Sequence, residues 1–495
     1  MDAKLNITRY RLVVRLALLA IPLALTGCMM HPEGTGAHRE ELKAAGKVYD
    51  RPVEQRNVPE VPDPATWQDV VQRAFLANGD LEAAYHEWRA ANERIDMASY
   101  WPNSNLSLGF EYMFSKEKIK AWDRTTLSAG FDPSAPLKLP QQAKQSGQVA
   151  LDAARVAAAK FRGAKFRIQR QVLIAYLDLA LMEEDLRIGQ ENCELLRRVM
   201  ENARSRVQGG APQQDLLKAQ VQLHLAENML QNEHSQVAAM KAMLNGMLVR
   251  PADAPLVLPD HLPQDRQIPV ADDRLIAVGV EQNPELAGLA QQVAGRKDAV
   301  VLAKMQFLPS INPAGAITGS ISQSLGAMVM IPTTIPMINA SIREAKAMLE
   351  ATDAMLRQTR ADRAAGFIAT LYALRSAERQ EDFYRNTILP AARALLTSSR
   401  QDYVSGRVGM VELIDAQRTL LDVRRTAAQF HIEREKRLAE LEELAGVDVE
   451  TLAAKAATQS SGTPASTQRL EDTKEHKEEH KEEQKENAGS AHQHS

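Results

Sequence analysis

The chain has 495 residues, 44% of them hydrophobic and only 5% aromatic, and its 60 basic side chains nearly balance its 63 acidic ones. The formal net charge of -3 does not favour a nucleic-acid partner, and two cysteines exclude a disulfide framework or a cysteine-rich metal site. Frequent Ala, Leu, Gln, Glu, Lys and Arg favour long helices over a β-sandwich or an α/β enzyme core.

The N-terminal residues have the pattern of an export signal. Four basic residues within 1–15 precede a short apolar run, 16–27, which is too short to span a membrane stably. The run ends in Leu25-Thr26-Gly27-Cys28, which resembles the lipobox of bacterial lipoproteins. The resemblance implies that 1–27 is a lipoprotein signal peptide and that Cys28 is acylated. The alternative is an ordinary signal peptide with an incidental cysteine.

Short motifs of the first half of the sequence recur, in the same order, in the second half. Asn78-Gly79-Asp80-Leu81 returns as Asn283-Pro284-Glu285-Leu286, each inside a helical pattern. Likewise, Gly209 and the segment 215–220 correspond to Gly406 and the segment 412–417. The sequence therefore predicts two tandem repeats joined by a Pro-rich connector in which helix cannot continue.

Each repeat has the same predicted order of elements, which makes the fold mainly α with a small β part. A short amphipathic helix leads into a strand pair, and then into two long helices with heptad spacing of apolar residues. The predicted segments are an N-terminal extended segment at 28–65, a first repeat at 66–250 (helix 66–100, hairpin 104–133, long helices 141–248), a connector at 251–270, and a second repeat at 271–450 (helix 271–307, hairpin 311–337, long helices 340–446).

The strand pairs have the length of transmembrane β-strands. Leu106, Leu108, Phe110, Tyr112 and Phe114 alternate onto one face of the first strand. Four strands are too few to close a membrane barrel, and lipid does not tolerate open sheet edges. We therefore expect several chains to share one barrel. The alternative is that the pairs are small periplasmic hairpins that cap the helices.

Together these features resemble the TolC/OprM-type outer-membrane efflux channels, and most specifically over residues 403–417. The strand pairs look mildly more like those of the heavy-metal branch, the CusC and CzcC type. The family resemblance implies a homotrimer with a 12-stranded β-barrel and a 12-helix α-barrel, lipid-anchored in the outer membrane and extending into the periplasm. It also implies a periplasmic adaptor protein and an inner-membrane pump of the RND type as partners, contact with outer-membrane lipid, no cofactor and no catalytic site.

The resemblance also assigns a pore gate where the long helices reverse. Gly209, Gly210, Gly406 and Gly409 allow the tight turns. By resemblance, Glu412 and Asp415 match an acidic pair that rings the pore, Asp215 matches the gate carboxylate of the first repeat, and Tyr403 matches a tyrosine of the gate network. The alternative is that these acids simply favour the helix N-terminal region.

The C-terminal segment 451–495 is rich in His, Lys and Glu and is expected to be disordered. His476, His480, His492 and His494 are weak candidates for a metal site. Elsewhere, Cys193 and the scattered His86, His224, His234 and His431 are interpreted as packing or surface residues, and no metal-ligand spacing is seen in the folded region.

The family resemblance implies a passive exit duct of a tripartite efflux system, gated at its periplasmic tip. Two alternatives remain: a duct for type I protein secretion, or a coiled-coil periplasmic lipoprotein without a pore. An enzyme is not expected, because the sequence shows no nucleophile–base set and no phosphate-binding loop.

Overall fold

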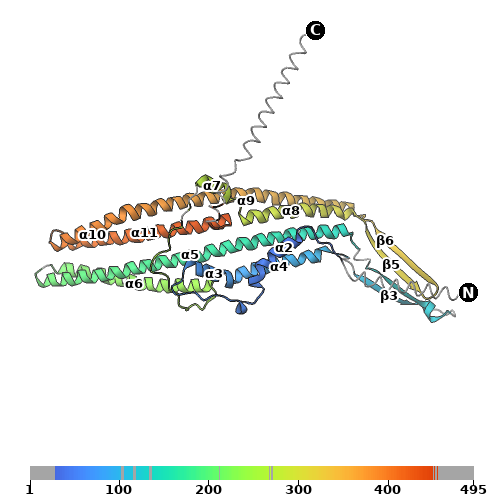
Figure 1. The fold of residues 1–495 in the computed structure, drawn as a ribbon, viewed down its shortest axis with the longest axis horizontal. Helices are drawn as coiled ribbons and strands as arrows, with labels where there is room; N and C mark the ends of the chain where they lie inside the picture. The colour runs from blue at the N-terminus through green and yellow to red at the C-terminus, as the bar shows by residue number, and fades with distance from the viewer. Residues whose placement is uncertain are drawn as a thin grey trace, which may run out of the picture.

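The computed structural model shows an elongated molecule with helix turns at one end and strands at the other (Figure 1). It describes residues 28–101, 105–114, 119–132, 137–210, 212–266, 268, 271–449, 451 and 454. The predicted signal peptide and the His-rich tail lie outside these residues. The prediction of a mainly helical chain with a small sheet is confirmed.

The N-terminal region is more helical than predicted. The segment 28–65, expected to be extended, contains helix α2 (Thr35–Tyr49) and the 3-10 turn η1 (Val53–Gln55). Leu42 and Tyr49 on α2 are buried in the main core. A Cβ at Gly46 would lie 2.3 Å from the Tyr85 hydroxyl oxygen, so this glycine allows α2 to lie close against the next helices. Tertiary burial of one face therefore stabilises a helix that the sequence pattern did not reveal.

The leading helix of each repeat is broken in two. In place of one helix at 66–100 there are α3 (Trp67–Ala77) and α4 (Gly79–Ser99), because Asn78 has extended backbone and its side chain accepts hydrogen bonds from the first turn of α4. In place of one helix at 271–307 there are α7 (Asp272–Gly279), α8 (Pro284–Lys304) and the 3-10 turn η3 (Met305–Phe307). Asn283 caps α8 in the same way, and Pro284 occupies its first turn.

The strands form one sheet rather than two separate hairpins. β3 (Leu106–Tyr112), β4 (Thr125–Phe131), β5 (Ser310–Thr318) and β6 (Ser322–Met330) are antiparallel in that order, so β4 of the first repeat pairs with β5 of the second. The 3-10 turn η2 (Ala121–Arg124) lies before β4. The second strand pair ends at Met330 rather than at residue 337, because Pro332 and Pro336 lack the N–H that a strand needs. A separate two-residue strand, β1 (Cys28–Met29), pairs with β2 (Tyr100–Trp101).

The long helices of the first repeat are α5 (Pro140–Gln208) and α6 (Gln213–Met247). α5 has 69 residues and contains no proline after Pro140 at its start, so the helix is uninterrupted. After α6, the described residues of the connector form no helix or strand.

The long helix pair of the second repeat contains an irregular turn. α9 (Ile335–Phe383) continues through a π-helical turn, η4 (Tyr384–Ile388), into α10 (Leu389–Val404), and α11 (Met410–Ala445) returns. Pro390 cannot donate the N–H of a regular α-turn, which explains why the helix widens just before it.

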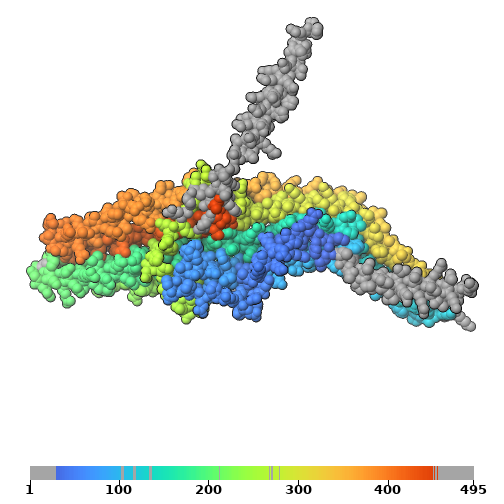
Figure 2. All heavy atoms as spheres, in the orientation of Figure 1, coloured from blue at the N-terminus to red at the C-terminus, as the bar shows by residue number. Residues whose placement is uncertain are grey.

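The two halves lie side by side along the molecule (Figure 2), with α11 packed against both α5 and α9, and α8 packed against both α5 and α9. The largest buried cluster joins α2, α3 and α4 to α5, and it includes Trp88, Phe161 and Ile432. A second cluster around Phe367 and Leu374 joins α7 and α9 to α11.

In the described part of the chain, no helix is long and apolar enough to span a lipid bilayer.

Candidate functional site

The turn between α5 and α6 depends on one left-handed residue. Gly210 has φ of 99°, a backbone conformation that residues with side chains rarely adopt. Its N–H donates a hydrogen bond to the Val207 carbonyl oxygen, with an N···O distance of 3.0 Å. Gly209 has φ of -85°, a backbone conformation that residues other than glycine also adopt. Asp215 lies in the first turn of α6 and is half-buried.

The turn between α10 and α11 is built differently. Gly406 has φ of 74°. The backbone N–H of the next residue, Arg407, donates a hydrogen bond to the Asp402 carbonyl oxygen, with an N···O distance of 2.8 Å. The Arg407 guanidinium also pairs with the Asp402 carboxylate over 3.0 Å. Gly409 is the N-cap of α11 with extended backbone, and a Cβ there would lie 2.8 Å from a Glu412 carboxylate oxygen.

The predicted gate carboxylates are solvent-accessible in one protomer. Glu412 and Asp415 are exposed on α11, and the Glu412 side chain folds back towards Gly409 at the helix N-terminus. Within the described residues of one protomer, neither these two carboxylates nor that of Asp215 forms an ion pair. Their negative charges are therefore available to a cation or to groups outside the protomer.

Tyr403 lies inside the helix tips rather than on their surface. It is 5% exposed and belongs to a small apolar cluster that draws on both repeats. The Arg206 guanidinium carbon lies 4.7 Å from its ring centroid. Its buried hydroxyl finds no hydrogen-bond partner among the described residues of the protomer.

At the opposite end of the molecule, the sheet has two chemically different faces. Register pairs Leu108 with Ala129, Ala129 with Gly315 and Gly315 with Leu325, so these four residues form one row across the sheet. The neighbouring row, which faces the other way, consists of Gly109, Ser128, Ala316 and Ser324. Leu325, Leu108 and Phe110 are 92%, 73% and 70% exposed. One face is therefore apolar and uncovered, and the other carries mostly small and polar residues, with Met328 and Met330 on it at the end of β6.

Cys28 lies where the helical part meets the strands. Its backbone pairs with Trp101 in β2, between the end of α4 and the start of β3. The other cysteine, Cys193, is 1% exposed on α5, and burial raises the pKa of its thiol. It is a packing residue, as the sequence predicted.

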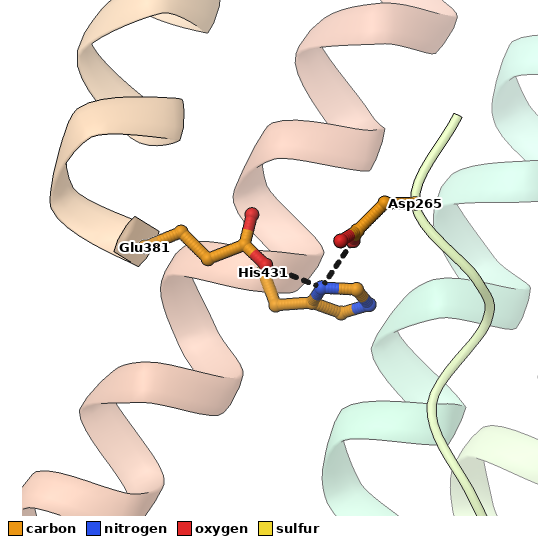
Figure 3. A group of neighbouring side chains, drawn as sticks. All are labelled: Asp265, Glu381 and His431. Carbon is orange, nitrogen blue, oxygen red and sulfur yellow. Dashed lines mark hydrogen bonds and ion pairs between the residues drawn. The ribbon is translucent and has the colours of Figure 1, made fainter. Parts of the chain in front are cut away.

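A buried charged cluster, which the sequence analysis missed, lies midway along the molecule. His431 of α11, Glu381 of α9 and Asp265 of the connector point towards one another (Figure 3). His431 Nδ1 lies 2.9 Å from Glu381 Oε1 and 2.9 Å from Asp265 Oδ1, and His431 Nε2 lies 2.8 Å from the Pro263 carbonyl oxygen. Burial alone lowers the pKa of His431, but the hydrogen bond and charge of Glu381, with Pro263 and Asp265, raise it above its ordinary value.

Arginines surround this cluster. Arg385 Nη1 lies 3.2 Å from Asp265 Oδ2 and 3.4 Å from Glu381 Oε1, and Arg434 Nη1 lies 3.5 Å from Asp265 Oδ1. Asp265, Glu381, His431 and Arg385 line a polar cavity of about 640 Å³ together with residues of α5, α10, α11 and the connector. No sequence signal could have found it, because its three central residues are far apart in the chain and show no ligand spacing. His476, His480, His492 and His494 lie outside the described residues.

Residues 279–447, within the second repeat, match the family model of the outer membrane efflux protein. No curated protein matches the sequence.

Solved structures match over most of the chain. CusC, in a structure described for its folding and transmembrane channel formation, is 15% identical, covers 77% of this chain and 92% of its own, and has a TM-score of 0.64. The outer membrane protein VceC from Vibrio cholerae is 13% identical, covers 77% of this chain and 96% of its own, and has a TM-score of 0.65. The CmeC outer membrane channel of Campylobacter jejuni is also 13% identical, covers 79% of this chain and 89% of its own, and has a TM-score of 0.64. At these identities the likeness is one of fold. The predicted similarity to outer-membrane efflux channels is confirmed.

Proposed function

We propose that this chain, which has the fold of the outer-membrane efflux channels, is the exit duct of a tripartite efflux system and works as a homotrimer. Three chains would share one 12-stranded barrel in the outer membrane, continuous with a 12-helix tunnel in the periplasm. An inner-membrane pump of the RND type and a periplasmic adaptor would supply the substrate and the energy.

The observation that carries the proposal is the two-faced, four-stranded sheet. Among the described residues, no further strand pairs with its outer strands, β3 and β6, and its apolar face is exposed. Lipid accepts such a sheet only if it closes into a barrel, and four strands are too few to do so alone. Three copies give an even number of strands, with apolar residues towards lipid and small polar residues towards a water-filled lumen.

The helical part supports the same assembly. Leu217, Val221, Leu225 and Met229 form an exposed stripe at four-residue spacing on α6. Each is more than half exposed in one protomer, and a neighbouring protomer would cover them.

A lipid anchor at Cys28 fits this arrangement. Cys28 pairs with β2, so acyl chains on it would lie next to the strands that would enter the membrane. The test is the mass of the mature N-terminus, which should include acyl chains in the native protein and lack them in Cys28→Ser.

The gate would form where three copies of the helix tips converge. Rings of Glu412, Asp415 and Asp215 would attract cations and repel anions at the pore. In this proposal, the buried Tyr403 hydroxyl, which lacks a partner within one protomer, bonds a neighbouring protomer.

The decisive experiment compares two adjacent residues of β6 that face opposite ways. Leu325→Arg puts a charge on the apolar face, which costs about 2–4 kcal/mol at the bilayer midplane, whereas Ser324→Arg puts it in the lumen. We expect Leu325→Arg to abolish heat-modifiable trimers in the outer membrane, and Ser324→Arg to keep them with altered ion selectivity. Planar bilayers with purified native protein should show conductance steps. Their absence, with equal effects of the two substitutions, would favour the coiled-coil lipoprotein without a pore.

A duct for type I protein secretion would also give conductance steps in planar bilayers. Deletion of the cognate pump distinguishes the two systems, because an efflux duct loses small-solute resistance and a secretion duct loses an exported protein.

A further inference from the structure

The hydrogen bonds of His431 leave one ring nitrogen facing two carboxylates. A carbonyl oxygen only accepts, so Nε2 must be the nitrogen that donates to Pro263. In the neutral ring, Nδ1 then has no proton and presents its lone pair to one oxygen of Glu381 and one of Asp265, each 2.9 Å away. Three electron-rich atoms at this separation repel one another. A cation must therefore lie among them, either a proton on Nδ1 or a metal ion.

The charge of the surrounding network is compatible with a divalent ion. Among the described residues, the ion pairs that link outward from His431 join six carboxylates to four guanidinium groups, so these groups carry two excess negative charges when His431 is neutral. The carboxylates are Asp265, Asp272, Glu378, Glu381, Glu435 and Glu442, and the guanidinium groups are Arg266, Arg375, Arg385 and Arg434.

The donor atoms have nearly the separation that a small metal ion requires. One ligand atom from each of the three side chains lies within 4.8 Å of the others. Zinc binds imidazole nitrogen and carboxylate oxygen at about 2.0–2.2 Å, so two ligands of a tetrahedral site lie roughly 3.3 Å apart. To bind the ion, the two 2.9 Å contacts of Nδ1 would widen by about 0.4 Å, and the Glu381 and Asp265 oxygens, which lie within 4.8 Å of each other, would settle at a similar separation of roughly 3.3 Å.

The surroundings supply the other parts of a metal site. The Pro263 carbonyl fixes the tautomer and orientation of the ring, as the outer partners of metal-bound histidines do. The adjoining cavity of about 640 Å³ gives an ion a path and provides water for the remaining coordination positions.

We propose that Asp265, Glu381 and His431 bind one divalent ion of the zinc type per protomer. An imidazole with two carboxylates suits Zn²⁺ or Co²⁺ better than Mg²⁺ or Ca²⁺, which take oxygen ligands. The ion ties the connector between the repeats to both α9 and α11 and holds the middle of the helical part together. This site is independent of the duct proposal, because its residues lie in one protomer and need no pore.

The test is Zn²⁺ titration of the purified full chain by calorimetry at neutral pH. The background carries His476, His480, His492 and His494 all replaced by Gln, so that the tail contributes no ligands. We expect one ion per protomer, and at least a tenfold loss of affinity in His431→Gln and in Glu381→Gln. His224→Gln is the matched control on an exposed helix position and should leave binding unchanged.

A further variant separates a ligand role from a packing role. Arg385 competes with the ion for Asp265 and Glu381, so Arg385→Gln should tighten Zn²⁺ binding, whereas loss of a purely structural ion pair would not. Circular dichroism reports whether each variant folds. If His431→Gln does not fold, Asp265→Asn on the connector replaces it and should show the same loss. The proposal is overturned if the native chain binds no Zn²⁺, in which case the cation is the proton, or if the ligand variants bind it as tightly as the native chain.

Discussion

The indole N–H of Trp88 donates to Nε2 of His38 over 3.0 Å, and both side chains are buried. This bond needs a neutral His38, since a protonated Nε2 cannot accept. Burial lowers the pKa of His38 below 6.5, and Arg155, Arg162 and Arg39 lower it further against the opposing charge of Glu41.

Acid should therefore loosen α2 from the helical core. A folded-state pKa below the unfolded value gives stability that is present above about 6.5 and is lost as the pH falls through the folded pKa. Thermal unfolding at pH 7.5 and pH 5 checks this: the native chain should lose more stability than His38→Gln does. Equal losses in the two proteins would contradict the assignment.

Asp152 on α5 should have the opposite pH dependence. Burial and the neighbouring carboxyl group of Asp298 on α8 raise its pKa to about 6, so between about pH 4 and 6 the folded chain holds a proton that the unfolded chain releases. Because the folded pKa lies above the unfolded value of about 4, this group's contribution to stability falls as the pH rises from about 4 through 6.

Asp152→Asn should remove that dependence. The Asn amide can still donate to Asp298 and carries no charge, so we expect a higher melting temperature than that of the native chain at pH 7.5 and a similar one at pH 4. Melting curves at the two pH values test this. A lower melting temperature for Asp152→Asn at pH 7.5 would show that the buried charge is well compensated.

At the helix tips, removal of the acidic pair should change conduction. The double variant Glu412→Ala and Asp415→Ala should lose block by divalent cations and weaken cation preference, since carboxylate rings cause both. Single-channel recording measures this, with Asp422→Ala, an exposed acid on the same helix, as the control. If divalent cations still block the double variant as they block the native channel, Glu412 and Asp415 do not line the pore.

The end of α11 should be sensitive to a single methyl group. Gly446 has φ of 67°, and a Cβ there would lie 2.2 Å from Pro284 Cδ at the start of α8. We expect Gly446→Ala to destabilise the chain by roughly 1–3 kcal/mol. Gly366→Ala, in the interior of α9 with open space around it, should instead be neutral or slightly stabilising. Urea unfolding of both variants tests the contrast.

Local sequence patterns predicted the regular parts of this fold and missed its long-range contacts. The heptad spacing of apolar residues was sufficient to predict a long helix in the region of α5, and Gly210 and Gly406 marked the two turns. The helix α2 was missed because its stability comes from burial against α4 and α5.

The charged cluster was missed for a related reason. Asp265, Glu381 and His431 share no spacing, and only the packing of α9 and α11 beside the connector brings them together. Of the predicted site residues, Tyr403 is buried inside the helix tips, Asp215 is half-buried, and Glu412 and Asp415 are exposed.

The pairing of β4 with β5 has a consequence for how the chain folds. Ala129 of β4 meets Gly315 of β5, and the whole of α5, α6, α7 and α8 lies between them in the sequence. Closing so long a loop is slow, because its entropy is lost before the contact is gained. The β3–β4 hairpin must therefore wait, with an open and aggregation-prone edge at β4, until β5 has been synthesised.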